Sequence, residues 1–207
     1  MYSHRPGLIL GFHGCDESVI ANVLSGQDVL RPSENAYDWL GHGIYFWEHS
    51  PTRALQYAEF LHARPQRANR PISRPAVIGA VMSLGNCLDL LDAANLKVLE
   101  EGYEVAKSIF LDDLPDNAID AISGEILLRY RDCAVIEVVH EALSPVARYD
   151  ISKKPYDSVR GAFFEGQPIY ENSGFRKHDH LQVCIRNPNC IKDYFLPRDL
   201  NEAYARV

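Results

Sequence analysis

The sequence predicts an α+β fold, in which helices flank a mainly antiparallel or mixed β-sheet. Two observations lead to this expectation. Short segments rich in aromatic and β-branched residues recur along the chain at the length of strands. Between them, apolar residues repeat at helical spacing behind recognisable helix caps. The length of 207 residues suits one domain with one core, so we expect residues 1–207 to form a single domain.

Six segments have the composition of strands. Each is five to nine residues long, largely apolar, and bordered by turn-forming or charged residues. Three of them lie within the first 84 residues and three lie after residue 157. The predicted strands are residues 8–13, 43–47, 76–84, 158–163, 181–185 and 191–196.

Two helices are predicted from their caps in the first third of the chain. Asp16 is a suitable N-cap for a helix over residues 17–25, and Gly26 is a suitable stop. Ser50 and Pro51 supply an N-cap and a proline at the first helical position. Apolar residues then continue at helical spacing, which predicts a second helix.

The middle of the chain combines a loop with a helical segment. Residues 64–75 contain four arginines and three prolines and no acidic residue, which predicts an exposed loop. Further on, the pattern predicts helices over residues 93–110 and 118–131, broken at residues 112–116. Residues 133–139 fit either a strand or a continued helix.

The net charge of −7 is concentrated in one region. Residues 92–147 carry 12 acidic and 4 basic side chains, whereas residues 1–91 and 148–207 are each close to neutral. This distribution predicts that residues 92–147 are an inserted, solvent-facing helical segment. The remaining chain stays close enough to neutrality to approach a polyanion.

The composition excludes several classes of protein. No apolar run approaches the roughly 18 residues that span a bilayer, and the first residues lack the apolar core of a secretory signal. We therefore expect a cytoplasmic protein with no membrane partner. The five cysteines are odd in number and contain no CxxC pair, which predicts buried reduced thiols. His178 and His180 have no obvious further metal ligands nearby, so we expect a solvated turn and no metal.

Five blocks of residues stand out when they are taken together and in order. The first two are Gly-Phe-His-Gly at residues 11–14 and Leu-Gly-His-Gly-Ile-Tyr-Phe at residues 40–46, followed by Ala-Leu-Gln-Tyr-Ala at residues 54–58. The others are residues 77–86, which end in Leu-Gly-Asn, residues 157–161, which contain Ser-Val-Arg-Gly, and residues 182–191, which begin at Gln182. This series resembles the poly(ADP-ribose) polymerase-like ADP-ribosyltransferases, a family that includes diphtheria-type toxins. The blocks leave residues 92–147 unmatched, as an insertion into the family's split, mainly antiparallel core.

The resemblance implies a site that binds NAD as a substrate. In this interpretation His13 binds the adenosine ribose, and the Gly14 main chain pairs with the nicotinamide carboxamide. Tyr45 and Tyr57 flank the cationic nicotinamide ring, since aromatic faces favour a positive partner. Two further groups complete the implied NAD-binding positions: Gly43 in the second block, and a hydroxyl on the carboxamide from either Ser50 or Thr52.

Gln182 stands where the family usually has a glutamate. Cleavage of the nicotinamide–ribose bond passes through an oxocarbenium-like state, which a carboxylate stabilises. Glutamine can hold ribose hydroxyls but lacks the charge, which favours transfer of single ADP-ribose units over polymer growth. Glu165 is either an exposed turn carboxylate or a group that restores the charge.

The resemblance implies a mono-ADP-ribosyltransferase of the bacterial toxin, effector or defence type, with His13, Tyr45 and Gln182 as its catalytic residues. The acceptor is a macromolecule, either protein or nucleic acid, and an antitoxin or immunity partner fits this type of protein. Two alternatives stay open: an NAD glycohydrolase, and a catalytically silent module that binds NAD or ADP-ribose. The arginines of residues 64–74 contact phosphates or are simply solvated. Residues 92–147 fit a lid, a partner dock or an acceptor platform.

Overall fold

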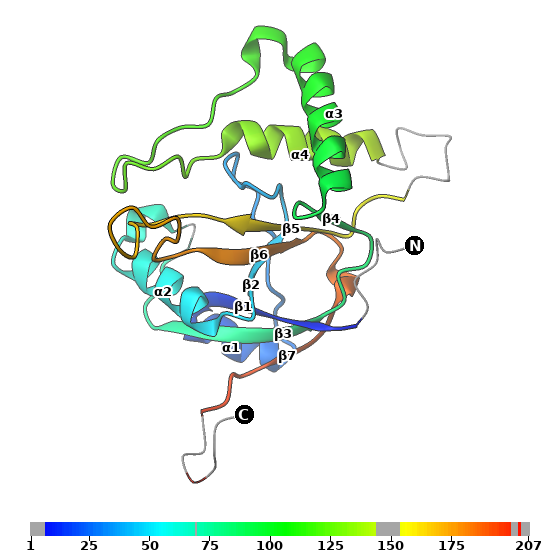
Figure 1. Ribbon diagram of the computed structural model, residues 1–207. Coiled ribbons are helices and arrows are strands. Elements are labelled where there is room, and N and C mark those ends of the chain that lie inside the picture. Colours follow the sequence, from blue (N-terminus) through cyan, green and yellow to red (C-terminus); the bar gives the residue numbers. More distant parts are fainter. Residues whose placement is uncertain (1–6, 69, 144–153, 200–202, 204–207) are drawn as a thin grey trace.

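The computed structural model describes residues 7–68, 70–143, 154–199 and 203. Its centre is a seven-stranded sheet with the strand order β4-β5-β6-β2-β1-β3-β7, seen in Figure 1. All six predicted strands are present, and the short strand β4 is an addition that the sequence did not indicate. The strands are β1 (Ile9–Asp16), β2 (Ile44–Glu48), β3 (Pro75–Met82), β4 (Cys87–Asp89), β5 (Ser158–Phe163), β6 (His180–Ile185) and β7 (Ile191–Phe195).

The sheet is antiparallel at every pairing except that of β4 with β5. This confirms the predicted α+β class with a mainly antiparallel sheet. β1 pairs with β3 along its whole length, but it pairs with β2 at two positions only, Gly11↔Glu48 and Phe12↔Trp47. The pairing of β1 with β2 therefore stops just before His13.

Four α-helices accompany the sheet in the described residues. Asp16 caps α1 as predicted, since its carboxylate accepts a hydrogen bond from the Ser18 main-chain N–H at 3.0 Å. The same carboxylate accepts from the N–H groups of Ser73 and Arg74, which fastens the end of the arginine-rich loop beside β1. The helices are α1 (Glu17–Leu24), α2 (Pro51–His62), α3 (Ala93–Phe110) and α4 (Tyr130–Leu143), with 3₁₀ turns η1 (Pro65–Arg67), η2 (Leu111–Asp113) and η4 (Pro188–Cys190).

The predicted helix over residues 118–131 is wrong. Most of this stretch is a turn closed by a bridge between Ala118 and Leu128. The Asp120 carboxylate accepts hydrogen bonds from the N–H groups of Ile122 and Ser123, and Gly124 follows with a φ of 73°. Such side-chain bonds to the backbone compete with helical pairing. The open choice for residues 133–139 is resolved as helix, within α4.

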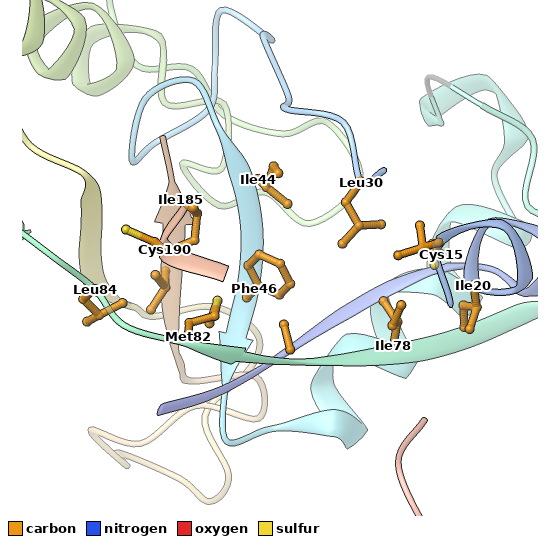
Figure 2. Close-up of a cluster of buried hydrophobic side chains, with 13 residues drawn as sticks. Cys15, Ile20, Leu30, Ile44, Phe46, Ile78, Met82, Leu84, Ile185 and Cys190 are labelled. Atoms are coloured by element: carbon orange, nitrogen blue, oxygen red, sulfur yellow. The ribbon is translucent and has the colours of Figure 1, made fainter. Parts of the chain in front are cut away.

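Side chains alternate across the sheet and divide the core into two parts. One part lies on the side of α1, which we call the α1 face. Figure 2 shows its side chains converging from β2, β3 and β6. The other part lies on the side of α2, α3 and α4, which we call the α2 face. The α1 face includes Cys15, Phe46, Ile78, Val183 and Ile185; the α2 face includes Phe12, Leu40, Trp47, Ala54, Leu88, Ile136, Val159 and Cys184.

The acidic segment is helical only in part and is less exposed than predicted. α3 and α4 pack together, and Figure 1 shows them beside the β4–β5 end of the sheet. Ile136 and Val139 of α4 are buried against Leu88 and Val159. Four of the five cysteines are buried and all are free thiols, as predicted, with Cys87 half-buried. Among the described residues no helix is long and apolar enough to cross a membrane.

Candidate functional site

His13 lies where β1 and β2 cease to pair. Its Nδ1 donates a hydrogen bond to the Tyr45 carbonyl oxygen at 2.8 Å. Because a carbonyl oxygen can only accept, Nδ1 carries the proton and Nε2 keeps a lone pair. Burial lowers the pKa of His13, which keeps its imidazole neutral near pH 7. Its ring meets the edge of Phe46 at a centroid distance of 5.9 Å, on the α1 face.

Tyr45 points to the opposite side of the sheet from His13. Its ring packs in the core of the α2 face, and its hydroxyl donates to the Gly41 carbonyl oxygen at 2.8 Å and accepts from the Leu40 N–H at 3.0 Å. Burial raises the pKa of Tyr45 well above its usual value. The hydroxyl is therefore occupied by main chain, and the ring is the part of Tyr45 that remains for contact with a ligand.

Two of the predicted glycines serve close packing. A methyl group on Gly14 would overlap the carbonyl oxygen of Ala54, so β1 and α2 touch backbone to backbone at this point. A methyl group on Gly43 would lie 2.6 Å from Cys184 Sγ. The main-chain groups of Gly43 exchange two hydrogen bonds with Ser33. Both glycines are thus required sterically, whatever further role they have.

The two predicted hydroxyl residues differ in position at the start of α2. Ser50 is half-buried and its side chain does not cap the helix, although its carbonyl oxygen accepts from the Ala54 N–H at 3.2 Å. Thr52 is exposed on the first turn. The choice between the two residues that the sequence left open stays open.

Gln182 lies in β6 beside Trp47 of β2 and Gly161 of β5, its register partners. Its Oε1 accepts a hydrogen bond from Trp39 Nε1 at 2.6 Å. Because an indole N–H can only donate, the facing atom must be the amide oxygen. The amide nitrogen then points away from Trp39 and has no hydrogen-bond partner among the described residues. Gln182 thus presents two N–H donors on the α2 face.

Rings from five separate segments surround this position, and we call them the aromatic cluster. Trp47 lies at its centre, 5.0 Å from the ring of Tyr57 and 6.0 Å from that of His180, measured between centroids. Phe163 lies 5.7 Å from His180 and 4.9 Å from Trp39. Tyr57 is 38% exposed, so the cluster reaches the surface at α2. The arrangement offers flat apolar surfaces beside the amide of Gln182.

A charged group borders the aromatic cluster. Arg53 of α2 forms an ion pair with Glu165, and Glu165 Oε1 lies 3.9 Å from His180 Nδ1. The Arg53 guanidinium also lies over the Trp47 ring at 5.9 Å. Glu165 is only 15% exposed, which places it beside the cluster and rules out the exposed turn carboxylate. The expected solvated turn is likewise wrong for His180, whose side chain is 3% exposed between two aromatic rings, although His178 is exposed.

Four buried polar atoms of this region have no hydrogen-bond partner among the described residues. They are Trp47 Nε1, Arg53 Nε, His180 Nε2 and, in the turn that leads to His180, Asp179 Oδ1. A buried polar group without a partner costs roughly 1–3 kcal/mol, and folded proteins contain few of them. Three of these atoms belong to the contacting side chains of Trp47, Arg53 and His180, which makes this cluster the candidate site for a polar ligand.

The helical insertion contributes to the rim of this site. The Arg129 guanidinium lies 6.0 Å from the Trp39 ring and 5.8 Å from the Phe163 ring. Glu125 binds Arg176 and accepts a hydrogen bond from the Gly166 N–H at 2.8 Å. The segment between α3 and α4 is thereby joined to the loop that precedes β6. Of the roles that fit residues 92–147, a lid and an acceptor platform agree with this position.

The structure therefore brings together only part of the predicted site. Tyr45, Tyr57 and Gln182 share the α2 face, while the ring of His13 lies on the α1 face. Sequence reasoning missed the site residues Trp39, Trp47, Arg53, Phe163 and His180. Two of them could have been predicted from the alternation of side chains along a strand. Trp47 stands two residues from Tyr45, and His180 stands two residues from Gln182, so each shares a face with a predicted site residue.

The comparisons with known proteins leave the family open. No family model and no solved structure matches this chain. An uncharacterized protein of the archaeon Methanocaldococcus jannaschii, MJ0359, is 21% identical over 195 residues, which cover 87% of this chain and 83% of that protein. Its name carries no function. Among the described residues, no three His, Cys, Asp or Glu side chains are grouped to hold a metal ion.

Proposed function

We propose that this protein binds NAD and transfers single ADP-ribose units to a macromolecule. The observation that carries the proposal is the position of Tyr57, Trp47 and Gln182 on one face of the sheet, beside unpaired buried donors. Flat aromatic surfaces suit a cationic nicotinamide ring, and the amide of Gln182 suits ribose hydroxyls. The order of the sequence blocks supports NAD as the ligand, in a protein of the toxin, effector or defence type.

His13 fits the proposal through its free nitrogen. Its Nδ1 is bound to the Tyr45 carbonyl oxygen, so Nε2 is able to accept a hydrogen bond from a ribose hydroxyl. His13 lies at the point where β1 and β2 stop pairing, in contact with Tyr45 of β2. His13→Ala should therefore weaken NAD binding, and an unchanged dissociation constant for NAD in calorimetry would remove His13 from the site.

Labelled NAD tests the proposed reaction directly. The purified protein is incubated with NAD labelled in its adenylate part and with separate protein, RNA and DNA fractions of a cell lysate. Label fixed in one macromolecular fraction supports transfer, whereas free ADP-ribose supports the glycohydrolase. Binding without consumption supports the silent module. If NAD is neither bound nor consumed, the proposal fails.

Gln182→Glu provides a sharper test because it adds the missing charge with almost no change of shape. A carboxylate oxygen can still accept the hydrogen bond from Trp39. At about 4 Å and an effective dielectric near 20, the added charge stabilises an oxocarbenium ion by up to roughly 4 kcal/mol. Nicotinamide release should accelerate by up to about a thousandfold.

The control for this variant is Gln27→Glu, which adds the same charge at an exposed position after α1. It should leave the rate of nicotinamide release unchanged. If Gln182→Glu binds NAD but releases nicotinamide at the wild-type rate, Gln182 does not lie beside the reacting ribose.

A further inference from the structure

The surroundings of His180 determine which of its nitrogens carries the proton. His180 Nδ1 lies 2.6 Å from the carbonyl oxygen of His178. Since that oxygen can only accept, Nδ1 carries the proton and Nε2 keeps a lone pair. The imidazole is held between the rings of Trp47 and Phe163. Its Nε2 is buried and has no partner in the described part of the chain.

A carboxylate stands on the proton-bearing side of the ring. Glu165 Oε1 lies 3.9 Å from His180 Nδ1, and Arg53 pairs with the same carboxylate. A carboxylate beside Nδ1 stabilises the imidazolium that forms when Nε2 takes up a proton. Burial lowers the pKa of His180 and Arg53 acts in the same direction, while the hydrogen bond to the His178 carbonyl oxygen and the charges of Glu165 and Asp179 oppose them. His180 is therefore neutral and able to act as a base near pH 7.

We infer that His180 is the general base that deprotonates the acceptor of ADP-ribose, with Glu165 as its positioning residue. This inference rests on the proposed function and deepens it, because Gln182 has no basic oxygen with which to take a proton. The base is thereby supplied by a residue two positions earlier on the same face of β6.

The step balances as follows. The acceptor oxygen forms a bond to C1 of the nicotinamide ribose, and the bond from C1 to the nicotinamide nitrogen breaks. The electron pair of that bond neutralises the pyridinium, which leaves as nicotinamide. The acceptor proton passes to His180 Nε2, and the imidazolium then releases it to solvent. The products are the ADP-ribosylated acceptor, nicotinamide and one proton.

The neighbouring donor indicates the chemistry of the acceptor. Trp47 Nε1 is also unpartnered in the described residues, and the Trp47 and His180 rings are 6.0 Å apart. A hydroxyl accepts from Trp47 Nε1 and donates to His180 Nε2 at the same time, whereas an ammonium has no lone pair with which to accept. The acceptor group is therefore a neutral hydroxyl.

Methanol is the probe for this inference. The full-length protein is incubated with NAD in buffered methanol between pH 5 and 9, and methyl ADP-ribose, ADP-ribose and nicotinamide are measured. His180→Gln should lower kcat for nicotinamide release at least about a hundredfold and leave the dissociation constant for NAD within about threefold. The matched control is His178→Gln, which changes an exposed histidine in the adjacent turn and should keep the wild-type rate.

The pH profile separates catalysis from a structural effect. The wild-type rate should fall at acid pH with a midpoint below 6.5, because protonated His180 cannot act as a base. Glu165→Gln removes a negative neighbour and should move that midpoint to lower pH. The residual rate of His180→Gln should no longer fall at acid pH, because the titrating imidazole is absent. If His180→Gln does not fold, His180→Asn and the wild-type profile provide the same test.

The outcomes distinguish the two proposals. A wild-type protein that neither binds nor cleaves NAD overturns the proposed function. A wild-type protein that cleaves NAD, with His180→Gln equally active or with the same acid limb, overturns the role of His180 and leaves transfer standing. A wild-type protein that binds NAD without cleaving it also overturns the role of His180, since there is then no proton to remove.

Discussion

Two buried arginine–carboxylate groups lie on opposite faces of the sheet and differ in how fully they are paired. On the α1 face, Arg160 donates through all three guanidinium nitrogens, to Glu48 and Asp89. On the α2 face, Arg53 pairs with Glu165 through one nitrogen while its Nε has no partner in the described chain. Both arginine side chains are largely buried, at 3% and 14% exposure.

The difference separates structure from function. A buried charge is tolerated when its hydrogen bonds are satisfied, and Arg160 meets this condition at the junction of β2, β4 and β5. Arg53 does not, and its unpaired nitrogen lies near two other unpaired atoms, on Trp47 and His180. Among the described residues, unpaired buried polar atoms gather around Trp47 and His180, whereas His140 Nε2 stands alone on α4. The group around Trp47 and His180 is the candidate site.

The largest expected effect comes from breaking the fully paired group of Arg160, Glu48 and Asp89. Arg160→Met leaves Glu48 and Asp89 without their cation, and removal of one partner of a buried pair typically costs about 3–5 kcal/mol. Urea denaturation should show that loss in the free energy of unfolding. Arg53→Met is the matched variant and should cost less than half as much, because Arg53 makes fewer hydrogen bonds. Equal losses would abolish the distinction between the two groups.

A second prediction uses a histidine with an unpaired nitrogen outside the site. His140 of α4 is buried, its Nε2 has no partner among the described residues, and burial lowers its pKa to about 4. Below pH 6.5 the unfolded chain binds a proton that the folded chain refuses until about pH 4, so stability falls as the pH falls through this window. The loss amounts to about 3 kcal/mol at pH 4.

His140→Leu should remove that part of the acid destabilisation, measured as the difference from wild type in denaturation at pH 7 and pH 4. Arg186 and Glu137 are the charged groups facing His140, and neither changes in this variant. His140→Leu should also leave NAD binding unaltered, because a single unpaired atom in an apolar core makes no site. Loss of NAD binding in His140→Leu would show that an isolated unpaired atom also affects the ligand. The contrast between His140 and the candidate site would then fail.

The smallest expected effect compares two tryptophans. Trp39→Phe removes an N–H that bonds Gln182, whereas Trp47→Phe removes an N–H with no partner in the described residues. Trp39→Phe should cost about 1 kcal/mol more stability than Trp47→Phe. Trp47→Phe should slow the formation of methyl ADP-ribose by about tenfold, the equivalent of one hydrogen bond to the acceptor hydroxyl. A larger stability loss for Trp47→Phe, with the formation of methyl ADP-ribose unchanged, would assign its N–H to the fold.

Much of the local structure follows from the sequence. Short-range signals determined the six predicted strands, the cap of α1 at Asp16 and the start of α2 at Pro51, because each depends on residues within a few positions. The same signals failed at residues 118–131. There Asp120 binds nearby N–H groups and also receives Arg67 from a distant loop, and no helical period in the segment reveals that contact.

The sequence by itself determined that His13, Tyr45 and Gln182 lie in strands, and through its blocks it suggested what they bind. Only the tertiary structure decided which side chains meet. β6 lies beside β2, so Gln182 is next to Trp47, and Arg53 reaches Glu165 across 112 positions of the chain. The physical reason is that strand pairing is non-local, and a side chain's face depends on register to within one residue.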